Sequence, residues 1–109
     1  AFDQIAALTP ANAVIGSTMN DGAIDLYARR ATFRPGEWSA EELVRFVEAM
    51  QRAQRRVLLL DDGAATSAAR HELAARYALQ PIAVLDVPLF GVVDGTAGVL
   101  WEITLTKDE

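Results

Sequence analysis

Hydrophobic and polar positions recur at helical spacing in several parts of the chain. The plainest pattern lies in residues 39–55, where a capping box of Ser39 and Glu42 opens the helix and charged residues cover the face opposite an apolar stripe. The stripe consists of Leu43, Val44, Phe46, Val47 and Met50. The same spacing predicts a short helix over residues 2–8 and a longer helix over residues 65–79.

A further helix is expected after Asn20, which can serve as its N-cap, with Asp21 in the first turn. One face of this helix would carry Ala23, Leu26, Tyr27 and Arg30. Since such a face packs on the sheet, we expect the Tyr27 side chain to be buried.

Apolar runs between turn residues predict the strands. Residues 13–17 and 57–60 are aliphatic without alternation, as expected of central parallel strands that are buried on both faces. A brief strand is expected over residues 31–34 and another over residues 82–90. Residues 99–105 alternate between apolar and polar positions, which predicts an antiparallel edge strand with one face in water.

Helices and strands alternate along most of the chain, which predicts a single α/β domain over residues 1–109. We expect a three-layer Rossmann-like domain with a mostly parallel sheet and helices on both faces. Because crossovers between parallel strands are right-handed, the expected strand order is 2-1-3-4-5, with the last strand antiparallel.

The composition narrows the classes of function. Hydrophobic residues make up 51% and charged residues 23% of the chain, which is ordinary for a folded domain. The net charge of −5, with basic residues that are not interleaved with aromatic ones, argues against nucleic acid as a partner. The absence of cysteine excludes disulfides and thiolate chemistry, and a single histidine, His71, argues against a zinc site.

Polar residues follow the first and third predicted strands at the points where these strands end. They are Ser17, Thr18, Asn20 and Asp21 after the first strand, and Asp61 and Asp62 after the third. Carboxyl ends of parallel strands meet at one edge of a sheet, so we expect these candidate ligand-binding residues to lie close together. Two full negative charges outweigh the roughly half charge of a helix terminus, which favours a divalent cation at Asp61 and Asp62, or sugar hydroxyls, over phosphate.

Each of these features also has an ordinary structural explanation. Residues 16–22 fit an ordinary strand-to-helix turn, and Asp62 fits a solvated residue that caps the following helix. The sequence therefore leaves open whether this edge binds a ligand or only connects elements. No serine has the surroundings of a catalytic nucleophile, so we expect no catalytic residue in this chain.

Several short motifs of the sequence resemble those of one known family. Residues 14–17 and 25–32 are similar to the soluble extracytoplasmic domain that follows the transmembrane helices of polytopic membrane glycosyltransferases, the bacterial relatives of dolichyl-phosphate-mannose-protein mannosyltransferases. Residues 76–81 match an Arg-Tyr-x-Leu-x-Pro phrase of that family, and residues 87–91 and 99–105 extend the likeness over most of the chain. Departures include Leu26, which replaces the first tyrosine of the usual pair.

The resemblance implies a function for the whole protein rather than for this domain alone. The catalytic carboxylate of that family lies in a loop between transmembrane helices, so no catalytic residue is carried over to this chain. What it implies is a non-catalytic accessory domain on the extracytoplasmic face of the bacterial cell membrane, beside an enzyme that uses a lipid-linked sugar donor. Its partners would be the transmembrane part of the same polypeptide and the lipid-linked sugar or acceptor. The chain begins at Ala1 without an initiator Met, in keeping with a domain excised from a larger membrane protein.

Two other hypotheses about the function of this chain remain open at this point. The first is a free-standing α/β ligand-binding or regulatory domain of receiver-like topology, because residues 57–63 resemble the first strand of receiver domains, although too few residues follow for a whole receiver. The second is a homodimer that joins two sheets through the unpaired edge of residues 99–105.

Overall fold

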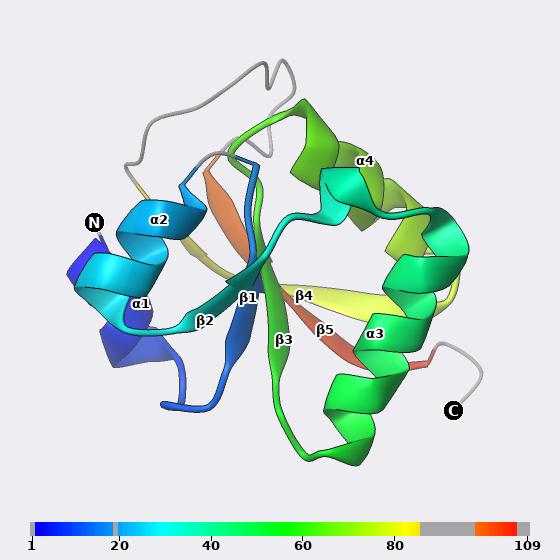
Figure 1. The fold of residues 1–109 in the computed structure, drawn as a ribbon, viewed down its shortest axis with the longest axis horizontal. Helices are drawn as coiled ribbons and strands as arrows, with labels where there is room; N and C mark the ends of the chain where they lie inside the picture. Colours follow the sequence, from blue (N-terminus) through cyan, green and yellow to red (C-terminus); the bar gives the residue numbers. More distant parts are fainter. Residues whose placement is uncertain (1, 19, 86–97, 107–109) are drawn as a thin grey trace.

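A mixed sheet of five strands runs through the middle of the structure (Figure 1). The computed structural model describes residues 2–18, 20–85 and 98–106, apart from the side chains of residues 105 and 106. The strands are β1 (Val14–Gly16), β2 (Ala31–Phe33), β3 (Val57–Leu60), β4 (Tyr77–Val84) and β5 (Val99–Thr106). Their order across the sheet is β2-β1-β3-β5-β4. The expectation of an α/β fold is confirmed. The sheet is mixed, with both parallel and antiparallel strand pairs, so the predicted mostly parallel sheet of a Rossmann-like domain is not observed.

The strand order differs from the predicted 2-1-3-4-5 because β5 lies between β3 and β4. Strands β1, β2 and β3 are parallel. Strand β5 is antiparallel to both of its neighbours, so its predicted direction is confirmed. Its predicted place at the edge is wrong, since Leu100 pairs with Leu60 on one side and with Ala83 on the other. The outer strand is β4 instead, which contains Pro81 and therefore lacks one backbone donor, a feature that suits an edge.

Helices cover both faces of this sheet, which gives three layers (Figure 1). In the described part of the chain, no helix is long and apolar enough to cross a membrane. The elements on one face are α1 (Phe2–Leu8), α2 (Asp21–Ala23) and its π-helical continuation η1 (Ile24–Ala28), and those on the other are the 3-10 turn η2 (Pro35–Glu37), α3 (Ala40–Arg52) and α4 (Ala64–Leu73).

Each face of the sheet has its own core. Val57 and Leu59 of β3 belong to one core, and Leu58 and Leu60 to the other, so this strand is buried on both faces as predicted. The core beneath α1 and η1 consists of Ile5, Ala13, Ile15, Ile24, Ala28, Leu58, Leu60, Leu85 and Leu100. The core beneath α3 and α4 consists of Val14, Phe33, Leu43, Val47, Val57, Leu59, Ala69, Leu73, Tyr77 and Ile103.

Helix α3 forms as its sequence predicts. The Ser39 hydroxyl accepts a hydrogen bond from the Glu42 backbone N–H at 3.2 Å, and the Glu42 carboxylate accepts one from the Ser39 N–H at 2.9 Å. The hydrogen bond from the Ser39 backbone N–H lowers the pKa of the Glu42 carboxyl. Both partners of the capping box are therefore in place.

Two predicted helices differ from the observed ones. Helix α4 ends at Leu73 rather than at residue 79, and Tyr77 begins β4, although its side chain is still buried in the same core as Leu73. The helix after Asn20 widens into the π-helical turn η1, which buries Ile24 and Ala28 at a spacing of four residues. Tyr27 is consequently 68% exposed, so its predicted burial is wrong.

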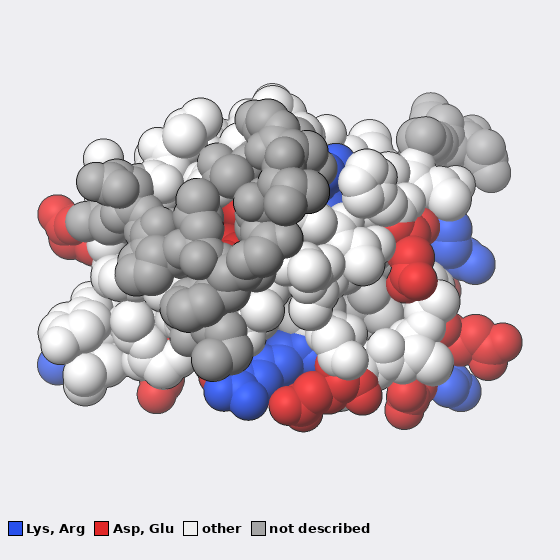
Figure 2. All heavy atoms as spheres, turned by 90° about the horizontal axis from the view of Figure 1, so that it is seen from above, with Lys and Arg blue, Asp and Glu red and all other residues white. Residues whose placement is uncertain are grey.

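Charges of both signs are intermingled on the molecular face that Figure 2 shows. Acidic and basic side chains lie next to one another there, and the described residues form no broad area of a single sign on this face. A polyanion would therefore find little electrostatic attraction on this side of the molecule.

Two glycines provide a matched test of backbone packing. A Cβ at Gly16 would lie 2.7 Å from Leu59 Cδ2 and 2.7 Å from Phe33 Cζ, whereas a Cβ at Gly22 would meet nothing within 4 Å. We expect Gly16→Ala to lower the free energy of unfolding by about 1–3 kcal/mol through overpacking. Gly22→Ala, in α2, should raise it by about 0.5–1 kcal/mol. Urea unfolding followed by circular dichroism measures both, and equal effects at the two sites would contradict this packing.

Candidate functional site

The carboxyl ends of β1 and β3 lie side by side and bring the turn after β1 against the start of α4. Register pairs Ile15 with Leu58 and Gly16 with Leu59, so residues beyond these positions emerge at the same edge. The structure thus brings Ser17, Thr18 and Asn20 together with Asp62, as the sequence analysis predicts.

Asp62 is the centre of this arrangement and is completely buried. Its Oδ2 accepts hydrogen bonds from Ser17 Oγ at 2.5 Å and from Asn20 Nδ2 at 2.7 Å. Its Oδ1 accepts hydrogen bonds from the Thr18 backbone N–H at 2.8 Å and from Thr66 Oγ1 at 3.2 Å. A carboxylate offers about four lone-pair positions, so these donors use the acceptor capacity of Asp62.

The donors around Asp62 are also linked to one another. The Ser17 hydroxyl accepts a hydrogen bond from the Asn20 backbone N–H at 2.9 Å. The Thr18 hydroxyl lies 2.9 Å from that of Thr66 and accepts a hydrogen bond from the Thr66 backbone N–H at 3.2 Å. We call these five residues the Asp62 network: it joins the turn after β1 to the first turns of α4.

Asp61 points away from this network and has partners of its own. Its Oδ1 accepts a hydrogen bond from Ser67 Oγ, and its Oδ2 accepts one from Arg70 Nε at 3.1 Å. The Arg70 guanidinium in turn lies over the Trp101 ring, 5.2 Å from its centroid. The two adjacent carboxylates therefore serve different partners and do not converge on one point, which corrects the picture of a shared acidic pair.

Asp21 lies outside the Asp62 network. Its Oδ2 is 3.0 Å from Arg34 Nε, an exposed ion pair that raises the pKa of the Arg34 guanidinium. Asn20 occupies the N-cap position of α2, but its side chain makes no capping hydrogen bond, and its amide nitrogen donates to Asp62. Of the turn residues proposed for ligand binding, Asp21 alone remains at the surface as a charged group.

This geometry favours a structural role for the polar edge over a cation site. Within the described ranges, no group of three or more His, Asp or Glu side chains is placed to hold a metal ion. The acceptor positions of Asp62 are taken by the protein's own donors, which leaves none directed at a cation. His71 is exposed on α4.

Sequence reasoning missed the partners that α4 supplies. Thr66 follows Asp62 by four residues, while Ser67 and Arg70 follow Asp61 by six and nine residues. An Asp just before a helix with Thr or Ser in its first turn is a usable signal for such contacts. Their separate directions depend on the extended backbone at the end of β3, where successive side chains point to opposite faces.

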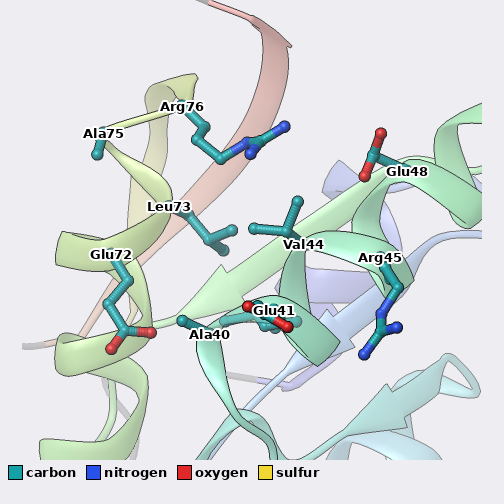
Figure 3. A pocket seen from close by; sticks show the side chains of 10 residues that line it. Ala40, Glu41, Val44, Arg45, Glu48, Glu72, Leu73, Ala75 and Arg76 are labelled. Atoms are coloured by element: carbon teal, nitrogen blue, oxygen red, sulfur yellow. The ribbon is translucent and has the colours of Figure 1, made fainter.

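A second candidate lies between α3 and α4, where the structure has a hollow of about 470 Å³ (Figure 3). Val44 and Leu73 point toward one another across it, and charged side chains stand around the rim. Its lining residues are Ala40, Glu41, Leu43, Val44, Arg45, Glu48, Glu72, Leu73, Ala75 and Arg76. No hydroxyl or imidazole is among these lining side chains, so we assign this hollow no chemistry.

Tyr77 lies beside a neighbouring hollow of about 320 Å³ that shares Glu48 and Arg76 with the first. Its hydroxyl is buried and has no hydrogen-bond partner among the described residues. Burial, together with the negative charge of Glu48, raises the pKa of this phenol, while Arg76 acts in the opposite direction. Among the described residues, the Tyr77 hydroxyl is therefore a buried polar group without a hydrogen-bond partner at close distance, and Arg76 is the charged donor that acts on it.

Removing the acceptor at the centre of the Asp62 network should destabilise the fold. In Asp62→Asn an amide N–H₂ group replaces one acceptor oxygen and faces donors, so we expect the free energy of unfolding to fall by about 3 kcal/mol. Asp21→Asn, which loses only an exposed ion pair, should cost about 0–1 kcal/mol. Urea unfolding of both variants measures the difference, and similar costs would show that the network is dispensable.

A cation titration decides between a structural role and a cation site. Addition of Mg²⁺ or Ca²⁺ to the wild-type chain should leave the amide NMR shifts around Asp61 and Asp62 unchanged. Shifts confined to these residues, and lost in Asp61→Asn with Asp62→Asn, would instead establish a cation site at this edge.

The buried Tyr77 hydroxyl predicts a pH dependence with a definite sign. Because its pKa is raised above the usual tyrosine value of about 10, the unfolded chain loses this proton first when the pH rises through about 10, and the folded state is destabilised. Tyr77→Phe should abolish this loss and stabilise the protein by about 0–1 kcal/mol at neutral pH. Tyr27→Phe, at an exposed tyrosine, is the control and should change neither quantity. A cost above about 2 kcal/mol for Tyr77→Phe would mean that the hydroxyl has a partner.

Comparison with known proteins adds no relative to this description. No family model matches the chain, and no curated protein or solved structure matches it. The functional interpretation therefore depends on the contacts described above and on the short sequence motifs that resemble the glycosyltransferase domain.

Proposed function

We propose that this chain is a non-catalytic, extracytoplasmic accessory domain of a bacterial membrane glycosyltransferase that uses a lipid-linked sugar donor. The resemblance of residues 14–17, 25–32 and 76–81 supports the choice of enzyme class. The observation that supports the accessory role is the Asp62 network, in which donors of the protein itself occupy the acceptor positions of the carboxylate at the sheet edge.

A catalytic role would require positioned groups that a substrate can reach. General acid and base catalysts act within hydrogen-bond distance of the proton that they transfer. Asp61 and Asp62 are both completely buried, and each makes hydrogen bonds within the domain. These contacts support a domain that shapes or holds a neighbouring site rather than one that transfers sugar itself.

An exposed apolar surface gives this domain a place to contact the rest of such an enzyme. Leu8, Leu26 and Tyr27 are 40%, 65% and 68% exposed, and Phe2 stacks on Tyr27 with 6.4 Å between ring centroids. We call these four residues the α1–η1 patch. Exposed apolar side chains of this kind are common at contact sites, and tyrosine is enriched at membrane interfaces. In this proposal the patch lies against the transmembrane part of the same polypeptide, near the lipid-linked sugar or its acceptor.

The receiver-like alternative has less support. A receiver-like order of 2-1-3-4-5 is not observed, because the antiparallel strand β5 separates β3 from β4. A free-standing ligand-binding domain would regain support only if the cation titration described above gave a specific site.

The coding sequence that precedes Ala1 is the first test of this proposal. Several apolar segments of about 20 residues in the same reading frame would support a membrane glycosyltransferase. A reading frame that encodes this domain and no membrane-spanning segment would overturn the proposal.

The second test measures sugar transfer. The isolated chain, incubated with lipid-phosphate sugars and acceptor, should show no turnover, and measurable transfer would contradict the accessory role. In the full polypeptide in membranes, Leu26→Asp combined with Tyr27→Asp should lower transfer about tenfold, which corresponds to about 1.4 kcal/mol of lost contact energy. Val84→Asp, at a residue that is 75% exposed on β4, is the matched control and should leave transfer unchanged.

A further inference from the structure

The outer face of α3 carries charges of alternating sign at regular spacing. They are Glu41, Arg45, Glu48 and Arg52, at positions i, i+4, i+7 and i+11, which places them on one stripe of the helix. Among the described residues, none of these side chains has a hydrogen bond or ion-pair partner. All but the half-buried Glu48 are exposed, so the stripe is open to a partner.

The stripe is complementary to itself when two copies run in opposite directions. Its centre lies between residues 46 and 47, and Glu41 is as far from this centre as Arg52, while Arg45 is as far from it as Glu48. An antiparallel pair of α3 helices therefore places each Glu opposite an Arg of the second copy. A parallel pair would place like charges opposite one another, which is unfavourable.

We propose that α3 is the interface of a homodimer, in which it packs antiparallel on α3 of a second copy about a two-fold axis near residues 46 and 47. Such an interface is isologous, so every contact of residue 41 with residue 52, or of residue 45 with residue 48, forms twice. The charges of the stripe set the direction and register of the pair.

The hollow beside the stripe supplies apolar surface for this contact. Its floor includes Leu43, Val44 and Leu73, and Figure 3 shows the side chains of Val44 and Leu73 directed toward each other across it. Leu43 and Leu73 are already buried, so the apolar surface still open to the second copy is that of the half-buried Val44 and of Ala40 and Ala75. Exposed ion pairs contribute only about 0–1 kcal/mol each, so burial of this surface adds to an association that the charges direct. Association should weaken as salt is added, because exposed charges are screened.

The sheet edges are less suited to joining two copies than α3. The predicted pairing through residues 99–105 is excluded by position, since both sides of β5 are occupied within the sheet. Of the outer strands, β2 has only three residues, and β4 contains Pro81 and two irregularities of register. Short strands, prolines and bulges are features that hinder pairing at an edge.

Charge reversal tests the proposed interface directly. Arg45→Glu and Glu48→Arg each place like charges opposite one another twice in a homodimer, so each variant alone should dimerise at least about tenfold more weakly than the wild type. An equimolar mixture of the two variants restores opposite charges at every such contact and should form a heterodimer. The variant that carries both substitutions should recover the homodimer. Sedimentation velocity of the 109-residue chain at low salt measures all four samples.

The controls separate this interface from effects on folding. Asp25→Arg reverses an exposed charge on η1, on the other face of the sheet from α3, and should leave association unchanged. Circular dichroism verifies that each variant is folded. A wild-type chain that stays monomeric at millimolar concentration, or a mixture that associates no better than the single variants, would overturn the proposal.

Discussion

The hydrogen bonds that Asp62 accepts hold together parts of the chain that are distant in sequence. A buried carboxylate without donors would cost several kcal/mol, so its place in the fold depends on Ser17, Thr18, Asn20 and Thr66. Through these donors the turn after β1 is joined to the start of α4, across the end of β3. The same contacts that stabilise this edge also occupy the acceptor positions of Asp62.

The functional proposals therefore depend on two exposed surfaces rather than on a cleft. The α1–η1 patch is apolar and lies on one side of the sheet, whereas the charged stripe of α3 lies on the other. Because the sheet separates them, a contact at the patch and a contact at α3 do not compete for the same surface. A domain with this arrangement can contact a different partner on each side of the sheet, whose two covering layers Figure 1 shows.

Local sequence patterns were reliable where a single element decided the outcome. The capping box at Ser39, the aliphatic strand of residues 57–60 and the approach of Ser17 to Asp62 were all predicted from the sequence. Local patterns that fit two different structures did not predict the outcome. The four-residue spacing of Ala69, Leu73 and Tyr77 suggested one helix, but the same core is lined by the end of α4 and the start of β4.

The sequence by itself determined the fold class, the main helix and the edge at which the polar residues gather, because periodicity, caps and strand ends are properties of neighbouring residues. Tertiary structure alone decided the insertion of β5 between β3 and β4, since strand order depends on which distant segments bury the most apolar surface together. It also decided the different directions of Asp61 and Asp62 and the exposure of Tyr27. Those outcomes depend on partners in α4 and on the π-helical turn, to which no local spacing in the sequence points.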